Sequence, residues 1–268
     1  MGRVPLAVTT SGRPEGLLPK ARAAAREWGV PFVPRPRNGS FGALLDTVAD
    51  AFIVFGRDSS GHETVVLTDR EGSLGFSGGM GHLRRLRLQT EEGVQQPDAL
   101  VRVAELRPGD SVLDCTLGLA SDALVTSLVV GPRGRVVGLE KSLALYAVVS
   151  EGLKRYELGP DSSRIEVVHA DALAYLRALP AGAFDVVFFD PMFARPKKSQ
   201  AAFEVLRRHA EHAPLTPEAL EEGRRVARRW VVVKGSRYSD DLKKLGLTPE
   251  PGTRSTDVVW GRGVGRGG

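Results

Sequence analysis

The sequence contains very little cysteine. Cys115 is the sole cysteine among 268 residues, so no disulfide bond can form within the chain, and a reducing compartment is favoured. A lone thiol also leaves little room for covalent catalysis through an activated cysteine thiolate, which must lie close to the substrate. The chemistry of this chain is therefore expected to rest on other side chains.

Two further absences narrow the class of protein. The five histidines are scattered along the chain and no cysteine cluster accompanies them, so we expect no metal site. No run of 18 apolar residues is present, and the N-terminal residues lead into a short strand pattern rather than a signal peptide. We expect a cytoplasmic protein without a membrane segment, and no sequence pattern indicates its oligomeric state.

The composition is that of a globular protein with a surplus of basic residues. Hydrophobic residues make up 42% of the chain and charged residues 26%, which is ordinary for one or two soluble domains of this total length. The formal net charge is +5. This surplus suits a polyanionic partner such as RNA, although many proteins with a similar balance bind no nucleic acid.

Four apolar runs each lead to an acidic residue. The runs 111–114, 135–139, 165–169 and 186–189 end at or just before Asp114, Glu140, Asp171 and Asp190. Such runs predict buried strands, and residues 123–130 predict a helix between the first two. Strands that alternate with helices predict a Rossmann-like α/β sheet, whose parallel strands present their carboxyl ends at one ligand-binding edge.

The turn after the first strand discriminates between two cofactors. A dinucleotide site of the G-x-G-x-x-G type needs glycines near the pyrophosphate, but Ala120 and Ala123 occupy the second and third positions. S-adenosylmethionine (SAM) has a sulfonium and an amino group, two ribose hydroxyls and no phosphate, so an acidic edge favours SAM over NAD. Glu140 lies where an acid grips a ribose diol, although Glu140 alone could be a solvated charge that begins a helix.

The tetrapeptide Asp190-Pro191-Met192-Phe193 follows the fourth run. Pro191 cannot continue a strand, so Asp190 is expected at the strand's carboxyl end. There the Asp190 carboxylate and the Pro191 carbonyl could accept the hydrogens of an exocyclic amine, while Phe193 stacks on the base. The alternative interpretation is a plain Asp-Pro turn without catalytic meaning.

Together these residues resemble a known family. The similarity is to bacterial class I methyltransferases that act on a guanine N2 of small-subunit ribosomal RNA, and it covers roughly residues 75 to 235. The similarity is found in the stretch 114–122, Glu140-Lys141, the turn 169–171, Asp190-Pro191-Met192-Phe193 with Lys197-Lys198-Ser199, and the Gly-rich segment 76–85. The chain departs from the family at Ala120-Ser121, where Gly-Arg is usual, and at Ala194, where a proline often stands.

The resemblance implies site residues for the cofactor and for RNA. Glu140 would hold the ribose of SAM, Asp171 the adenine side, and Asp114 and Asp122 the methionine end. The complete set of expected cofactor contacts is Asp114, Gly118, Ser121, Asp122, Glu140, Lys141, Asp171, Ala172 and Asp190. The expected catalytic residues are Asp190, Pro191 and Phe193, and the expected RNA contacts are Arg84, Arg85, Arg195, Lys197 and Lys198.

The chain is expected to divide near residue 90. Residues 1–90 predict a small N-terminal α/β lobe, and residues 91–268 the SAM-dependent methyltransferase domain. The later part predicts helices over 97–106, 200–209 and 216–229 and strands over 230–234 and 257–260. Residues 261–268 are glycine-rich and predict a frayed tail.

The sequence thus favours a SAM-dependent N-methyltransferase that acts on an exocyclic base amine of RNA, foremost guanine N2 of small-subunit ribosomal RNA. One alternative is a SAM enzyme that methylates a protein amide or a small amine. The other is an RNA-binding assembly factor that keeps the fold without turnover. Binding of SAM and methyl transfer to RNA discriminate among the three.

Overall fold

The computed structural model of the chain describes residues 3–12, 16–35, 40–191, 201–210, 213–251 and 257–268. Its contacts divide the chain into two compact units. Unit 1 comprises Met1–Ser77, Ser142–Tyr156 and Lys197–Ala210, and unit 2 comprises Gly78–Lys141, Glu157–Pro196 and Glu211–Gly268. Both units are discontinuous in the sequence, whereas the sequence-based division at residue 90 is continuous and stays a prediction.

Unit 1 is built on a four-stranded sheet in the order β1-β2-β3-β4. The strands are β1 (Val4–Thr10), β2 (Ala49–Arg57), β3 (Glu63–Thr68) and β4 (Ser73–Gly75). Strands β1 and β2 are parallel, and the remaining neighbours are antiparallel. The small N-terminal α/β arrangement expected from the sequence is therefore present.

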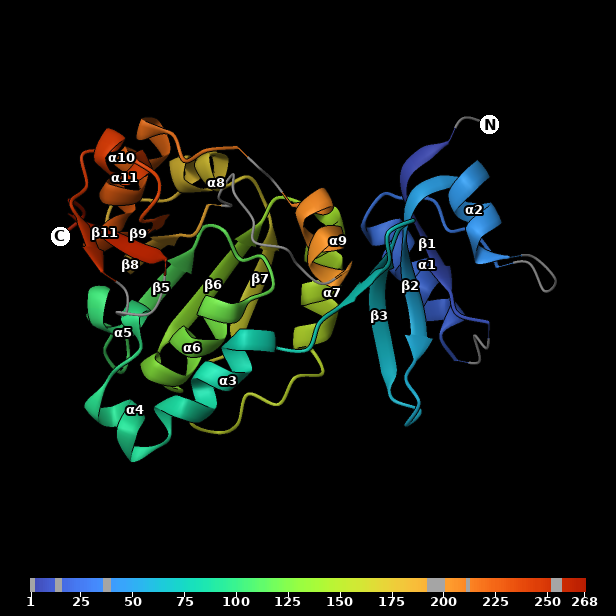
Figure 1. The fold of residues 1–268 in the computed structure, drawn as a ribbon, viewed down its shortest axis with the longest axis horizontal. Coiled ribbons are helices and arrows are strands. Elements are labelled where there is room, and N and C mark those ends of the chain that lie inside the picture. Colours follow the sequence, from blue (N-terminus) through green and yellow to red (C-terminus); the bar gives the residue numbers. More distant parts are fainter. Residues whose placement is uncertain (1–2, 13–15, 36–39, 192–200, 211–212, 252–256) are drawn as a thin grey trace. The chain divides into compact units, whose positions relative to one another are not determined.

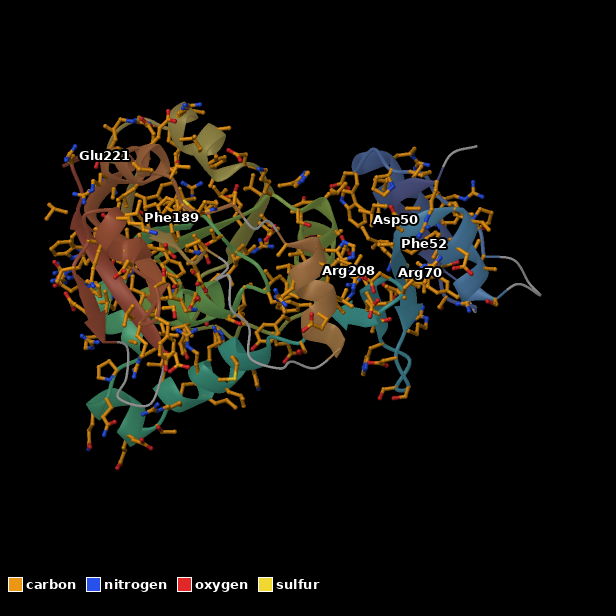
Figure 2. The ribbon with its side chains drawn as sticks, turned by 45° about the horizontal axis from the view of Figure 1, so that its top comes forward. Asp50, Phe52, Arg70, Phe189, Arg208 and Glu221 are labelled. Atoms are coloured by element: carbon orange, nitrogen blue, oxygen red, sulfur yellow. The ribbon has the colours of Figure 1, made fainter. Side chains whose placement is uncertain are left out.

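Side chains alternate between the two faces of β2 and pack in two separate clusters. Ile53 packs with buried alanines of α1, whereas Phe52, labelled in Figure 2, packs with Leu44 of α2. The helices of unit 1 are α1 (Leu18–Glu27), α2 (Phe41–Thr47), α7 (Leu143–Leu153) and α9 (Ala201–His209). Ala147 of α7 joins the cluster around Ile53, so a helix far along the sequence completes the core of this unit.

Unit 2 is built on a seven-stranded sheet in the order β10-β11-β9-β8-β5-β6-β7 (Figure 1). The strands are β5 (Ser111–Asp114), β6 (Arg135–Glu140), β7 (Ile165–His169), β8 (Phe184–Phe189), β9 (Ala227–Ser236), β10 (Pro249–Pro251) and β11 (Val258–Val264). The neighbouring strands β7, β6, β5, β8 and β9 are parallel to one another, whereas β11 is antiparallel to both β9 and β10. The predicted Rossmann-like sheet is confirmed, with its first strand, β5, in the interior.

Helices of unit 2 connect and cover these strands. They are α3 (Gly79–Leu88), α4 (Glu91–Gln95), α5 (Ala99–Val103), α6 (Ser121–Val130), α8 (Ala172–Ala178), α10 (Pro217–Val226) and α11 (Asp241–Lys244). The side chain of Thr216 accepts a hydrogen bond from the amide of Ala219, and Pro217 follows it, so α10 begins with a cap and a first-turn proline. Phe189, labelled in Figure 2, lies in the core with Leu220 of α10. No helix in the described ranges is long and apolar enough to span a membrane.

The predicted frayed tail after residue 260 is wrong. Strand β11 continues to Val264 beside β9, and the amide of Gly265 donates a hydrogen bond to the Arg229 carbonyl over 2.9 Å. A β-carbon at Gly263 would lie 2.9 Å from Nη2 of Arg224, and one at Gly265 would lie 2.3 Å from the Ala227 carbonyl oxygen. The glycines therefore permit close packing of the backbone, which composition alone does not distinguish from disorder.

Two predicted helices are shorter than expected. Helix α5 spans only Ala99–Val103, and its first turn is capped by Asp98, whose side chain accepts from the Leu100 amide. Helix α10 ends at Val226 because strand β9 begins at Ala227 and pairs with β8. For α10 the strand pairing overrides the helical pattern at the helix end, whereas α5 ends before Glu105, whose φ of 48° is left-handed.

Candidate active site

The carboxyl edge of the parallel strands in unit 2 carries the predicted acids. Asp114 ends β5 and Glu140 ends β6, while Asp171 follows β7 and Asp190 follows β8. Asp114 lies opposite Gly138 of β6 and Phe188 of β8, so the acids share one edge of the sheet. The tertiary structure thus brings together residues that are spread over 76 positions of sequence, from 114 to 190.

The loop between β5 and α6 is shaped by backbone geometry. Gly118 has a φ of +51°, and its amide donates to Oε2 of Glu140 over 3.0 Å. Ala120 also adopts the left-handed region, with a φ of 59°, and stands at the N-cap of α6 without a capping side chain. The first amides of α6 therefore lack a side-chain cap and suit an anionic group such as a carboxylate.

A network of ion pairs joins three elements at this edge. Nη1 of Arg84 lies 2.6 Å from Oδ1 of Asp122, and Nζ of Lys234 lies 3.2 Å from Oδ2 of Asp122. Nζ of Lys234 also lies 2.6 Å from Oδ2 of Asp190. Lys234 was not predicted as a site residue, although its place near the end of the strand beside β8 was a usable signal.

Burial and charge shift the ionisation of these groups. Burial raises the pKa of Asp114 to about 8, despite a hydrogen bond from the Thr116 amide. Burial likewise outweighs Lys234 and raises the pKa of Asp190. For Asp122 burial is outweighed by Lys234 and Arg84, which lower the pKa of its carboxyl group. In the same way Asp190 and Asp122 outweigh burial and raise the pKa of Lys234, so its ammonium stays charged.

Arg84 and Arg85 have partners inside unit 2. Besides Asp122, Arg84 binds Asp98 through Nε and Nη2, both at 2.8 Å from the carboxylate oxygens. Arg85 is 8% exposed, and its Nη1 donates to the Leu124 carbonyl over 2.9 Å. Both arginines lie on α3, which packs on α6, so their guanidinium groups reach acceptors there. Their contact with RNA stays a prediction.

The remaining predicted cofactor residues lie at the outer part of the same edge. Nζ of Lys141 lies 3.4 Å from Oδ2 of Asp171, and both side chains are about half exposed. Asp171 is the N-cap of α8, which begins at Ala172, and its side chain accepts a hydrogen bond from the Ala174 amide. This hydrogen bond lowers the pKa of Asp171. Ser121 begins α6 next to Asp122.

The predicted catalytic loop is described only at its start. The amide of Asp190 donates to Oγ1 of Thr116 over 2.5 Å, which ties this loop to the loop after β5. Pro191 follows and is half-buried, whereas Phe193, Arg195, Lys197 and Lys198 lie outside the described residues. Cys115 is buried, and burial raises the pKa of its thiol, so it is unsuited to act as a nucleophile.

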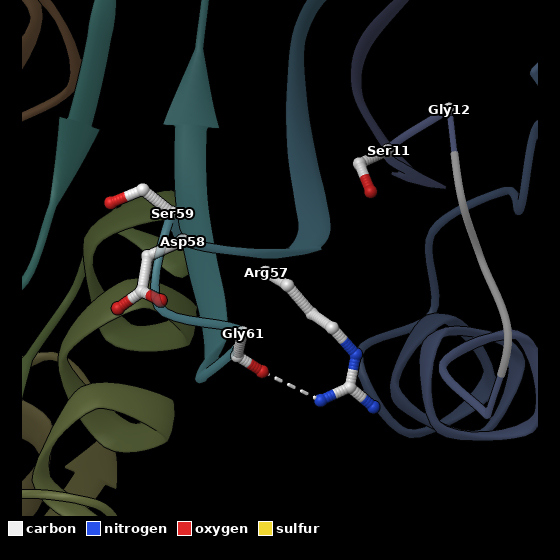
Figure 3. Close-up of a pocket in the computed structure, with 6 residues that line it drawn as sticks. All are labelled: Ser11, Gly12, Arg57, Asp58, Ser59 and Gly61. Atoms are coloured by element: carbon white, nitrogen blue, oxygen red, sulfur yellow. Dashed lines mark hydrogen bonds between the residues drawn. The ribbon is translucent and has the colours of Figure 1, made fainter.

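Two other features do not add a site. Within the described ranges, no group of three or more His, Cys, Asp or Glu residues could hold a metal ion. Unit 1 has a cavity of about 440 Å³ at the end of β2, where Arg57 donates to the Gly61 carbonyl over 2.9 Å (Figure 3). The Glu63 carboxylate lies 3.7 Å from Arg57 and 2.6 Å from Lys20, and we assign no ligand to this cavity.

The edge fits SAM group by group. The N-terminus of α6 has no side-chain cap and suits an anion, the buried carboxylates suit cations, and Glu140 ends the strand next to β5, a position that suits a ribose. Fold and site define a SAM-dependent methyltransferase. The chain belongs to the putative SAM-dependent methyltransferase family, whose model matches residues 75–256.

Curated relatives are similar over part or most of their length. The uncharacterized protein YpiP of Bacillus subtilis is 33% identical over 247 residues, which cover 90% of this chain and 92% of YpiP. The ribosomal RNA small subunit methyltransferase J of Erwinia tasmaniensis is 29% identical over 67% of this chain and 72% of its own length. For the protein of that name from Laribacter hongkongensis the identity is 34%, but the match spans about half of each chain, 47% and 48%.

Solved structures with a similar fold include TrmN from Thermus thermophilus, with 19% identity, a TM-score of 0.44, and coverage of 97% of this chain and 71% of TrmN. A SAM-dependent methyltransferase from Aquifex aeolicus gives 15% identity and a TM-score of 0.42, over 70% of this chain and 98% of its own.

Proposed function

We propose that this methyltransferase acts on an exocyclic amine of an RNA base, specifically guanine N2 of small-subunit ribosomal RNA. The observation that carries the proposal is the placement of Asp190 at the end of β8, tied to the loop after β5 and beside the SAM-binding edge. Relatives named ribosomal RNA small subunit methyltransferase J support the choice of RNA, as does the net charge of +5.

The acidic edge would hold SAM in a fixed orientation. Glu140 would bind the ribose hydroxyls and Asp171 the adenine side. Asp122 and the uncapped N-terminus of α6 would bind the amino and carboxylate groups of the methionine end. Bound SAM supplies an electrophilic methyl group.

The amine is prepared by acceptors rather than by a strong base. The lone pair of guanine N2 is delocalised into the ring, so the amine must be polarised and oriented by hydrogen-bond acceptors. In the proposal the Asp190 carboxylate and the Pro191 carbonyl accept its two hydrogens. Phe193 would stack on a base turned out of its helix, and Arg195, Lys197 and Lys198 would bind the flanking phosphates.

Nucleoside mass spectrometry of small-subunit RNA from a deletion strain tests this proposal. We expect N2-methylguanosine to fall and to return when the wild-type chain is supplied on a plasmid. An Asp190→Ala chain should not restore it, because removal of a group that organises the transition state commonly costs about a hundredfold or more in rate.

Two results would contradict the proposal. One is undiminished N2-methylguanosine in the deletion strain together with no methyl transfer to naked RNA or to assembled subunits in vitro. The other is full restoration by the Asp190→Ala chain, which would leave Asp190 without a role in the reaction. The first result would leave a protein amide or a small amine as the acceptor.

A further inference from the structure

Lys234 lies between the Asp190 carboxylate and the Asp122 carboxylate at the start of α6. It belongs to β9, the strand next to β8, and its side chain is only 20% exposed. Nζ lies 2.6 Å from Oδ2 of Asp190 and 3.2 Å from Oδ2 of Asp122. The ring of Trp260 lies with its centroid 5.7 Å from the same nitrogen. One ammonium group therefore contacts the carboxylate proposed to orient the amine and the carboxylate at the start of α6.

The titratable groups around Asp190 lie on four other elements. Asp122 on α6 repels its carboxylate, while Lys234 on β9 and Arg84 on α3 attract it. Burial raises the pKa of Asp114 on β5 to about 8, so Asp114 is neutral below that pH and repels Asp190 only once it ionises. Arg84 forms ion pairs with Asp98 and Asp122, and it acts on Asp190 at longer range. Lys234 is the cation that forms a hydrogen bond with Asp190 among the described residues.

A buried carboxylate without such a partner favours its protonated form. A protonated Asp190 would have one oxygen occupied by a proton and would offer a donor where the proposed reaction needs an acceptor. Its side chain would also be free to turn about the bond that carries the carboxyl group. An ammonium group fixed at 2.6 Å opposes both changes.

We propose that Lys234 is a positioning residue that keeps Asp190 ionised and oriented as an acceptor and links it through Asp122 to the cofactor-binding end of α6. This inference rests on the proposed role of Asp190 in orienting the amine. The link has a physical consequence: a change at Asp122 alters how strongly Lys234 holds Asp190, because the two carboxylates share one ammonium.

Titration of Asp190 in the full-length protein tests the inference directly. Protein labelled with ¹³C at the aspartate carboxyl carbon is titrated by NMR, and the Asp190 signal is assigned by its loss in Asp190→Asn. We expect Lys234→Met to move the Asp190 midpoint to higher pH by about 1 to 3 units, the usual effect of losing an adjacent opposite charge. Lys234→Arg should keep the midpoint near its wild-type value.

A second variant moves the midpoint in the opposite direction. Asp122→Asn removes a repelling carboxylate, and the Lys234 ammonium then interacts with the Asp190 carboxylate without competition from Asp122. The titration midpoint of Asp190 should therefore fall to lower pH. Lys243→Met is the matched control, because Lys243 is an exposed lysine of the same unit that pairs with Asp240 over 3.0 Å; it should leave the Asp190 signal unchanged.

The two opposite shifts separate a positioning role from general stabilisation. An unchanged midpoint in folded Lys234→Met protein would overturn the inference. If that variant does not fold, an unchanged or raised midpoint in Asp122→Asn would overturn it instead. The titration needs neither SAM nor RNA, so a failure of the proposed substrate leaves this result readable.

Discussion

At the scale of single residues, burial makes ionisation of the acid at the end of β5 unfavourable. Asp114 is 3% exposed, and its Oδ1 accepts the Thr116 amide over 3.0 Å. Burial outweighs that bond and raises the pKa of Asp114 to about 8. An unfolded chain would release the same proton near pH 4, so the native state carries an extra proton over the pH range between these values.

Asp114→Asn is expected to stabilise the protein at alkaline pH. The contribution of Asp114 to stability is present below about pH 4 and is lost as the pH rises through the folded pKa of about 8. Asparagine keeps an oxygen for the Thr116 amide but cannot ionise. The melting temperature of Asp114→Asn relative to wild type should therefore rise between pH 5 and pH 9. Asp161→Asn, at an exposed position, is the control, and a difference that does not vary with pH would contradict this prediction.

Glu140→Gln should weaken SAM binding. Glu140 is 6% exposed, and Oε2 accepts the Gly118 amide over 3.0 Å. Glutamine keeps the volume and one acceptor oxygen but removes the charge and an acceptor for the ribose diol. Calorimetry should show a loss of roughly 1–3 kcal/mol in SAM binding. Glu166→Gln on the neighbouring strand β7, an exposed residue paired with Arg135, should bind SAM as wild type does; equal affinity in Glu140→Gln would remove Glu140 from the site.

At the scale of elements, the packing of α3 on α6 sets the geometry of the cofactor edge. A β-carbon at Gly81 would lie 2.7 Å from the Ser121 carbonyl oxygen and 2.8 Å from the Ser121 Cα. Those atoms are helix backbone and cannot rotate away. Gly81 therefore lets α3 approach α6 closely enough for Arg84 to reach Asp122.

Gly81→Ala should push the two helices apart. We expect a loss of stability of about 1–3 kcal/mol from overpacking, together with weaker SAM binding, because the contact lies at the first residue of α6. Gly12→Ala is the control, since a β-carbon there meets no atom within 4 Å. Thermal unfolding and SAM titration provide the two readouts. Wild-type values for both in Gly81→Ala would show that the helices tolerate the methyl group.

The elements also show where local patterns suffice. The strands β5 to β8 match the apolar runs because short β-branched and aromatic runs favour strands, although β7, at the edge of the sheet, is only partly buried. The C-terminal strand β11 was underestimated because the glycines after Trp260 lack side chains that signal a strand. Only the pairing of residues 261–264 with β9 identifies them as strand.

At the scale of the whole molecule, the chain passes repeatedly between two units. Helix α7 follows β6 of unit 2 in sequence but packs in unit 1, where Ala147 is fully buried with Val8 and Ile53. Residues 1–77 therefore cover part of the apolar surface of α7. Helix α7 thus belongs to the core of unit 1 although the residues on both sides of it in sequence belong to unit 2.

A fragment of residues 78–268 should not fold as a stable methyltransferase domain. Removal of the first 77 residues would expose the apolar side of α7 that packs with Val8 and Ile53. We expect stronger binding of a hydrophobic dye and a broadened, lower thermal transition than in the full chain. Circular dichroism and dye fluorescence measure both. A monomeric fragment with the wild-type melting temperature would contradict this prediction and favour the continuous division at residue 90.

The sequence alone predicted the parallel strands β5 to β9 in their order along the chain and the acids at the ends of β5 to β8. These features depend on the alternation of apolar and polar residues and on turn residues, all of which act over a few positions. It also indicated the cofactor, because the charges that suit a sulfonium stand directly after the strands.

Only the tertiary structure decided which charges neutralise each other and which unit each helix joins. Lys234 reaches Asp122 across 112 positions and Asp190 across 44, and Arg84 reaches Asp122 across 38. Such pairs depend on which strands become neighbours and on how deeply the side chains are buried. Burial then sets the energetic weight of each charge, and no local pattern in the sequence encodes that weight.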